Sequence, residues 1–351
     1  MASIAIGISF IANFALYKFI VMNEGLKKTI QIVVSAAIAI GMLAYIFSIV
    51  DINSMVVELQ KADYKWILAS IAISMVAHVA RGLHWNLLLE PLGQKIRPIN
   101  AIKSVLAGYL ANYALPRAGE VVRCSIVKKT DDVPVNISLG TVITERIVDV
   151  AAMGLVFCLA LVFEFNYLTK FLTDFFDSKA KGTDGNSNYI IYVLLLVASL
   201  GIAFVVVFIK NKENFLKIGI VAKIYGFAEG LLQGILSITK MKNSWLFIFY
   251  TFLIWFSYYA MTYVILFSMA DTASLPPASG LVILALASLG MAAPVQGGIG
   301  PYHLMVASAL SIYGIVWEKG LILATILHTS QFVTMLVFGG ISLVWVAFEK
   351  K

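Results

Sequence analysis

Two carboxylates and an arginine in the run 144–149, Thr-Glu-Arg-Ile-Val-Asp, stand at the spacing of one helix face. Glu145 and Asp149 are four residues apart, and Arg146 precedes Asp149 by three. Side chains at these separations are neighbours on a helix. Such carboxylates can orient a guanidinium group, accept a cationic group or take up a proton.

A second group of charges follows a break in an apolar segment. Arg117, Glu120 and Arg123 are spaced three residues apart, directly after Pro116. Guanidinium groups form paired hydrogen bonds with phosphate oxygens, and half-helix N-termini add partial positive charge. Charges at membrane depth are costly and mark functional sites. The run therefore predicts a site for an anionic headgroup beside a broken helix.

The segment 66–89 adds His78, Arg81 and His84, so basic and acidic side chains occur on three neighbouring elements. One interpretation is a set of buried ion pairs that fixes helix packing without a ligand. The other, which we favour because the charges accompany a broken helix, is a binding site for the headgroup of an amphiphile. Asn112, just before the break, is assigned to this site.

A second break, Pro294-Val-Gln-Gly-Gly-Ile-Gly-Pro301, lies in the other half of the chain. Gly297, Gly298 and Gly300 allow backbone N–H groups to approach a ligand, although tight helix packing explains such glycines equally well. His303 follows, either as a satisfied polar side chain or as a proton-linked one. Paired breaks in two halves of a membrane protein point to the binding site of a transporter.

Composition places the chain among polytopic membrane proteins. Of its 351 residues, 60% are hydrophobic and 13% are charged, which is far from soluble globular proteins. The net charge of +7 fits lysine- and arginine-rich cytoplasmic loops, and no nucleic-acid-binding module is recognisable. Cys124 and Cys158 have no metal-site spacing, and no nucleophile or metal motif accompanies the carboxylates. We expect no cofactor, no bound metal and no catalytic residue, so the chain is expected not to be an enzyme.

Apolar segments of about 20 residues predict the membrane-spanning helices. These segments are 30–50, 66–89, 137–163, 189–209, 244–269 and 320–347. Two further apolar segments, 102–127 and 277–316, are cut by the breaks into arms too short to cross, and we predict re-entrant helical hairpins. The alternative for each is one kinked full-length span. Residues 1–24 are an extra N-terminal apolar segment, either a further helix or a stretch before a start at Met22.

The order helix, hairpin, helix occurs twice, over about 66–163 and about 244–347. With 189–209 as an intervening span the two units have opposite orientations. The predicted fold class is therefore an all-α polytopic membrane bundle with two inverted repeats, each containing a re-entrant helical hairpin. Lysine-rich loops then fall on the cytoplasmic side, which predicts an inner-membrane protein with a cytoplasmic C-terminus. Residues 222–239 are predicted to be an amphipathic helix, either interfacial or packed on the bundle.

In three runs, 112–123, 145–149 and 294–300, the sequence resembles the lysylphosphatidylglycerol synthase transmembrane (flippase-like) family. The resemblance covers about residues 25–347 and assigns residues 25–351 to one flippase-like transmembrane domain. It implies a polytopic helical domain with re-entrant segments, which in some members flips an aminoacylated phospholipid across the membrane.

Two departures from the family pattern leave the substrate open. Gln296 replaces a proline that is common in the family, and His303 stands where an acidic residue is frequent. No soluble synthase domain follows residue 351, so we expect that this chain does not itself charge a lipid with an amino acid.

The hypothesis is a transporter that moves an anionic or aminoacylated phospholipid, or a polyprenyl-phosphate-linked lipid, between leaflets. Its arginines bind the headgroup and its carboxylates orient them or couple to protons. Two alternatives stay open: a membrane-embedded enzyme acting on a lipid-linked phosphate or sugar, and a non-transporting partner of a separate lipid-modifying synthase. The predicted substrate-binding residues are Arg81, Asn112, Arg117, Glu120, Arg123, Glu145, Arg146, Asp149, Gly297, Gly298, Gly300 and His303.

Overall fold

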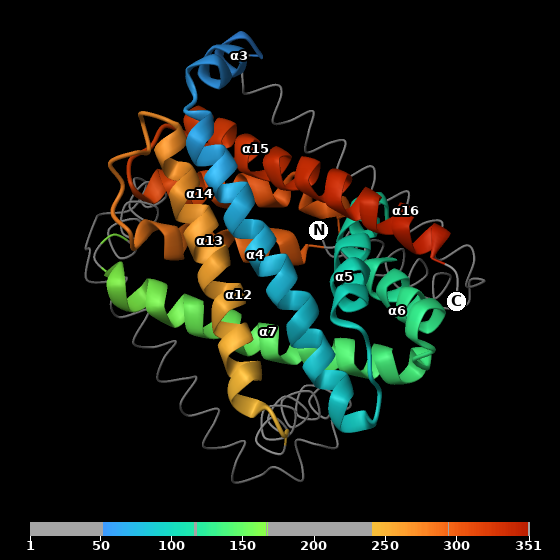
Figure 1. Cartoon of the computed structure of the whole chain (residues 1–351). Coiled ribbons are helices and arrows are strands. Elements are labelled where there is room, and N and C mark those ends of the chain that lie inside the picture. The colour runs from blue at the N-terminus through green and yellow to red at the C-terminus, as the bar shows by residue number, and fades with distance from the viewer. Residues whose placement is uncertain (1–51, 116–117, 166, 168–240, 294, 350–351) are drawn as a thin grey trace, which may run out of the picture.

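A computed structural model of the chain describes residues 52–115, 118–165, 167, 241–293 and 295–349. Within these residues every regular element is helical (Figure 1). The predicted segments 1–24, 30–50, 189–209 and 222–239 lie outside the described residues. The all-α prediction is confirmed for the described part of the chain.

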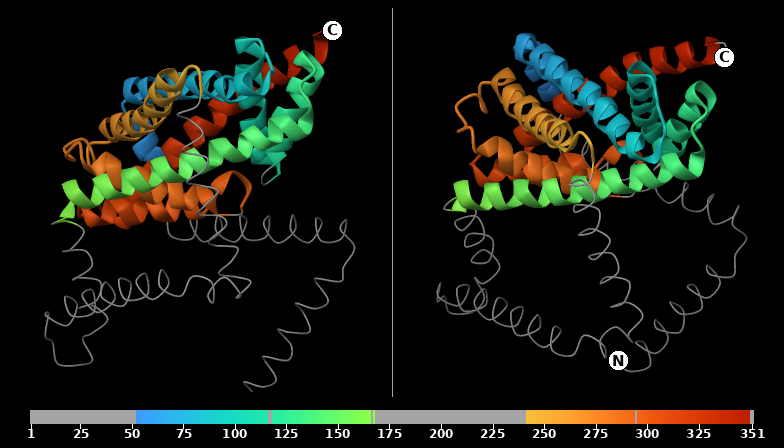
Figure 2. Two further views of the ribbon diagram at one scale, coloured as in Figure 1. Left: turned by 90° about the horizontal axis from the view of Figure 1, so that it is seen from below. Right: turned by 60° about the horizontal axis from the view of Figure 1, so that its bottom comes forward.

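In the described part of the chain, four helices are long and apolar enough to cross a membrane, as their sequences predict. They are α4 (Tyr64–Leu89), α7 (Val135–Phe163), α12 (Ser244–Val264) and the continuous run α15 (Trp317–Thr334), η4 (Met335–Gly339) and α16 (Gly340–Phe348). The short elements beside them are α3 (Ile52–Lys61), η1 (Glu90–Leu92) and η2 (Ile265–Ser268). Figure 2 shows α7 lying along one side of the described helices.

The first interrupted segment forms two helices that lie against each other, α5 (Pro98–Ala114) and α6 (Ala118–Asp131). The start of α5 lies beside the end of α6: Asn100 Nδ2 donates a hydrogen bond of 2.8 Å to Asp131 Oδ2. Near the break the two backbones touch: a methyl group added at Gly119 would overlap the carbonyl oxygen of Gly108. The pair is therefore antiparallel, and its closed end is where α5 ends and α6 begins.

The second interrupted segment also forms a packed helix pair, α13 (Ser279–Ala292) and α14 (Pro301–Ile312), with the turn η3 (Gln296–Gly298) between them. A methyl group added at Gly290 would lie 2.7 Å from the Cα atom of Tyr302, so these two backbones are also in close contact. Positive φ angles at Gly297, Gly298 and Gly300, of 56°, 70° and 95°, explain why this turn is built from glycine.

The open ends of the two pairs lie at opposite ends of α4. Asn86, near the end of α4, donates to the carbonyl oxygen of Ile96 just before α5. At the start of α4, the N–H of Asp63 donates to the carbonyl oxygen of Ser268. Ser268 is the last residue of η2, which lies between α12 and α13 in the chain. The chain therefore enters the two pairs from opposite ends of α4.

Packing between the two halves of the chain is reciprocal. Helix α4 packs along α12, α7 packs on α13, and η4 with α16 packs on α5. Figure 1 shows α4 and α12 side by side, and α15 running on into α16 from the second helix pair to the first. The apolar core follows this division: one cluster joins α13, α14 and α15, and another joins α4, α5, α6 and α7.

Candidate functional site

The side chain of Glu145 on α7 is fully buried and lies between two arginines from other helices. Arg123 on α6 binds it with both terminal nitrogens, Nη2 to Oε2 at 2.8 Å and Nη1 to Oε1 at 3.2 Å. Arg81 on α4 approaches the same carboxylate at 3.5 Å and bonds Asp149, one turn along α7, at 2.6 Å. Four charges from three helices thus form one connected group, of which Asp149 is the partly exposed member.

Aromatic side chains hold these arginines in place. The guanidinium carbon of Arg123 lies 4.0 Å from the centre of the Trp85 ring, within the range of cation–π attraction. Trp85 is itself fixed, because its indole N–H donates to Thr141 Oγ1 at 2.9 Å. On the other side, Arg81 Nη2 donates to the hydroxyl of Tyr258 at 3.4 Å. The inner charges are therefore fixed by the fold.

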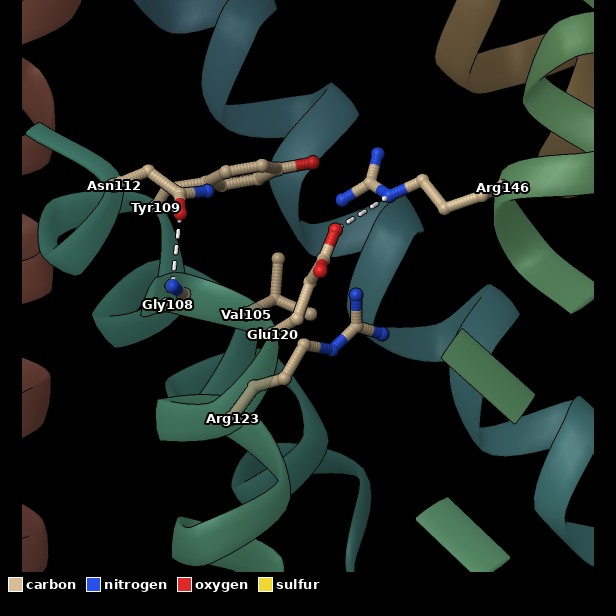
Figure 3. Close-up of a pocket in the computed structure, with 8 residues that line it drawn as sticks. Val105, Gly108, Tyr109, Asn112, Glu120, Arg123 and Arg146 are labelled. Carbon is tan, nitrogen blue, oxygen red and sulfur yellow. Dashed lines mark hydrogen bonds and ion pairs between the residues drawn. The ribbon is translucent and has the colours of Figure 1, made fainter. Parts of the chain in front are cut away.

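A second, looser pair of charges lies on the outside of this group. Arg146 Nε is 3.5 Å from Glu120 Oε1, and Arg146 Nη1 is 3.3 Å from Asp149 Oδ2. The side chain of Arg146 is 41% exposed and that of Glu120 is 33% exposed, whereas those of Arg123 and Glu145 are 4% and 0% exposed. Figure 3 shows Glu120 and Arg146 pointing toward each other across a hollow.

The hollow lies between the closed end of the first helix pair and α7. Its lining residues are Val105, Gly108, Tyr109, Asn112, Gly119, Glu120, Arg123 and Arg146. The hollow has room for about one water molecule. In this arrangement of the helices the hollow is thus too small for a group much larger than water.

Asn112, which lines this hollow, joins the two helices of the first pair. Its Oδ1 accepts a hydrogen bond of 2.8 Å from the N–H of Gly119, in the first turn of α6. First-turn N–H groups of a helix have no partner in their own helix. Asn112 therefore ties the end of α5 to the start of α6, which makes it a structural element of the break.

The charges of the described cluster balance. Three arginines (Arg81, Arg123, Arg146) face three carboxylates (Glu120, Glu145, Asp149). Removing one partner of a buried ion pair costs about 3–5 kcal/mol, because the other charge stays buried without compensation. The cluster thus has a rigid inner part and an outer pair that can exchange partners at lower cost.

The predicted glycine residues lie in a separate polar group, around the break of the second helix pair. His328 Nε2 is 2.8 Å from the carbonyl oxygen of Gly297, and His303 Nδ1 accepts from the N–H of Gly300 at 3.4 Å. The two imidazole rings are 4.9 Å apart. Tyr113, at the end of α5, lies edge-on to His328, and a methyl group added at Gly297 would overlap its ring. The ends of the two helix pairs therefore meet at this tyrosine.

Of the predicted site residues, Arg117 lies outside the described part of the chain, as do Pro116 and Pro294. The structure brings Arg81, Glu120, Arg123, Glu145, Arg146 and Asp149 together, with Asn112 at the edge of the hollow. It places Gly297, Gly298, Gly300 and His303 around the other break.

Sequence reasoning did not assign Trp85, Tyr109, Tyr113 or Tyr258 to the site, because aromatic residues on apolar helices are not distinguishable from lipid-facing ones by spacing. Over the described residues, no group of three or more His, Cys, Asp or Glu side chains is placed to hold a metal ion.

Comparison with known proteins gives a family match over most of the chain. The family described as the lysylphosphatidylglycerol synthase TM region matches residues 32–339. A UPF0104 membrane protein of Methanocaldococcus jannaschii is 23% identical over 128 residues, which are 36% of this chain and 37% of that protein. The chain thus spans little more than a third of the curated relative that it matches, and no solved structure matches it. The chain is a multi-pass membrane protein and belongs to the family of the lysylphosphatidylglycerol synthase TM region.

Proposed function

We propose that this protein moves a lipid with a phosphate-bearing headgroup from one membrane leaflet to the other, and that Arg146 binds the phosphate. The observation that carries the proposal is the contrast between the inner charges and the outer pair. Arg81, Arg123 and Glu145 are buried, and their shortest contacts with partner charges are 2.6 and 2.8 Å, whereas Arg146 and Glu120 are partly exposed, 3.5 Å apart, and line a hollow. A phosphate can take the place of Glu120 on Arg146 without breaking the Arg123–Glu145 fork.

In the membrane, we propose that both helix pairs are re-entrant and that the two halves are inverted repeats. The opposite positions of their open ends support this arrangement. So does the reciprocal packing, in which the last helix of each half lies on the first helix of the other half's pair. Broken helices that meet near the membrane midplane are a recurrent way to build a transport site.

The proposed mechanism uses the charge balance of the cluster. Because the cluster is neutral, an anionic headgroup adds a net negative charge unless it displaces a carboxylate from Arg146. Glu120, on the helix pair, is the carboxylate that can leave, while Asp149 stays bonded to Arg81 at 2.6 Å. Headgroup binding is thereby coupled to separation of α6 from α7, which opens the hollow.

We propose an anionic or aminoacylated phospholipid, or a polyprenyl-phosphate-linked lipid, as the cargo. The site of action is the inner membrane, with the C-terminus in the cytoplasm.

A separate lipid-modifying synthase is the proposed partner that supplies an aminoacylated cargo. Affinity purification of the tagged protein, followed by identification of co-purifying lipid-modifying enzymes, tests this last point.

The transport proposal is tested with purified protein in vesicles that contain fluorescent phosphatidylglycerol, by measuring how fast a membrane-impermeant quencher reaches the inner-leaflet label. A charge-assisted hydrogen bond is worth about 1.5–3 kcal/mol, so Arg146→Ala is expected to slow transport roughly tenfold or more. Arg146→Lys keeps the charge but loses the planar fork, and its transport is expected to fall between the two.

The matched control is Lys128→Ala, which removes an exposed ion pair with Asp132 on the same helix pair. Its transport rate is expected to equal that of the wild type. Equal rates for wild type and Arg146→Ala would contradict the assigned role of Arg146. Mass spectrometry of the lipids from the same vesicles separates transport from catalysis: a chemically altered lipid would support the enzyme alternative instead.

A further inference from the structure

The two halves of the last apolar run are bonded to different parts of the molecule. Helix α15 packs on α14 of the second helix pair and is bonded to the far end of the bundle. Its Lys319 Nζ lies 2.7 Å from Glu58 on α3 and 3.3 Å from Asp271. Farther along the helix, His328 bonds the carbonyl oxygen of Gly297 at the second break.

Helix α16 is bonded to the first helix pair. Glu349, directly after it, accepts from Lys103 Nζ and from Arg97 Nη2, both at 2.6 Å, at the start of α5. Lys129, near the end of α6, donates to the carbonyl oxygen of Val346 at 2.7 Å. Because these contacts involve both α5 and α6, α16 is fastened to the open end of the first pair.

Between these halves the helix changes its geometry. Residues Met335–Gly339 form the π-helix η4, and Gly339 is followed by a second glycine, Gly340. A π-turn is wider than an α-helical turn and is frequently found at functional sites. Adjacent glycines add backbone freedom, because they have no side chains to limit their φ and ψ angles. This is the least regular point of a run that is otherwise α-helical.

We propose that η4 is a joint, at which α16 and the first helix pair move as one unit relative to α15 and the second pair. The proposal rests on the proposed function, since it supplies the movement that opens the hollow. The Arg123–Glu145 fork is the pivot, because it joins α6 to α7 by the best-paired buried charges. Glu120, one turn from Arg123 on the side of the break, then swings away from Arg146.

The boundary between the two units is suited to separation. Tyr113 at the end of α5 lies 4.9 Å, ring centre to ring centre, from Phe332 on α15, and 5.9 Å from the His328 ring. These are aromatic contacts without a charge, so parting them leaves no ion unpaired. The contacts within the moving unit are charge-assisted hydrogen bonds, which are roughly twice as strong as neutral ones.

Cysteine crosslinking in a background without Cys124 and Cys158 tests the joint. Tyr113→Cys with Phe332→Cys crosses the boundary, and a short thiol-reactive crosslinker is expected to abolish phosphatidylglycerol transport until it is cleaved. Lys103→Cys with Glu349→Cys lies within one unit; loss of its ion pair is expected to slow transport, and the crosslink to restore it. A within-unit crosslink that blocks transport, or a boundary crosslink that leaves transport unchanged, would overturn the proposal.

Spin-label distances give a readout that does not depend on transport. Labels at the exposed positions Val121 on α6 and Val316 before α15 report across the boundary, and labels at Val121 and Phe348 report within the unit. In phosphatidylglycerol vesicles, the first distance is expected to show two populations that differ by about 5 Å, the size of a one-turn helix shift. The second is expected to show one population.

The two readouts separate the joint from the proposed function. If no variant transports lipid but the distance across the boundary has two populations, the joint stands and the transport function fails. A single, equally narrow population for both label pairs would overturn the joint, whatever the transport rates are.

Discussion

The two helix pairs have the same shape but different chemistry. In each, a glycine lets the backbones touch: Gly119 against Gly108 in the first pair, and Gly290 against Tyr302 in the second. The first pair places charges beside its break, and these pair with carboxylates on α7. The second pair places glycine carbonyls and imidazoles there instead. The shape of a pair thus depends on small residues at its backbone contact, and its chemistry depends on the residues around the break.

The two breaks are also stabilised in different ways. Around the first break, opposite charges compensate each other, and removing one leaves a buried ion. Around the second break, neutral groups bond backbone atoms, and removing one costs only a neutral hydrogen bond of about 1 kcal/mol. The first break is therefore expected to be the more sensitive to substitution.

The largest expected effect comes from Glu145→Gln. This change keeps the size of the side chain but leaves Arg123 and Arg81 without their shared carboxylate, at an expected cost of about 3–5 kcal/mol. Thermal unfolding in detergent measures it. The comparison is His328→Gln at the second break, where about 1 kcal/mol is expected. Similar losses for both variants would show that the two breaks do not differ as described.

The glycine contacts test what the two helix pairs have in common, since added methyl groups are expected to destabilise both pairs to a similar extent. Gly119→Ala and Gly290→Ala each add a methyl group that meets backbone atoms, and overpacking of this kind costs about 1–3 kcal/mol. Gly140→Ala and Gly154→Ala on α7 are matched controls, because nothing lies within 4 Å of the added atom. The unfolding temperatures of all four variants test this expectation. Control variants whose unfolding temperatures fall as much as those of the contact variants would contradict a special need for glycine at the two backbone contacts.

Much of the site follows from residue spacing, and the rest depends on how the helices pack. The i, i+4 spacing of Glu145 and Asp149 predicted one face, and Arg81 contacts both carboxylates. Spacing within α7 contains no information about which arginine comes from α4 and which from α6. The half-exposed state of Arg146 and the burial of Arg123 likewise arise only when α6 packs on α7.

The meeting point of the breaks was not predictable from either segment alone. Tyr113 and Gly297 are far apart in sequence, and a tyrosine at the end of an apolar helix has no local signature of such a contact. The π-helix in the last run is hidden in the same way, because the apolar pattern of 320–347 fits a regular helix. Only the pair Gly339–Gly340 marks the position.

A smaller effect is expected at the contact between the two breaks. Gly297→Ala places a side chain at φ 56° and against the Tyr113 ring, where a left-handed conformation alone costs about 1–2 kcal/mol. Tyr113→Ala removes the obstacle but not the backbone strain. The double variant is therefore expected to lose less stability than the sum of the two single changes, by thermal unfolding. Strict additivity would contradict direct contact between the two helix pairs at this point.

The smallest expected effect is the pH dependence of the stability that Glu349 contributes. This residue, directly after α16, forms ion pairs with the open end of the first helix pair. Lys103 and Arg97 hold the pKa of Glu349 below its ordinary value of 4.5, chiefly through the hydrogen bond from Lys103. A carboxylate whose pKa is lowered by folding stabilises the folded state above its ordinary pKa, and this contribution is lost as the pH falls through the lowered value. The difference in unfolding temperature between wild type and Glu349→Gln is therefore expected to be constant near neutral pH and to shrink below pH 4.5. A difference that stays constant down to the acid limit of folding would show that the charge of Glu349 does not hold α16 to the first pair.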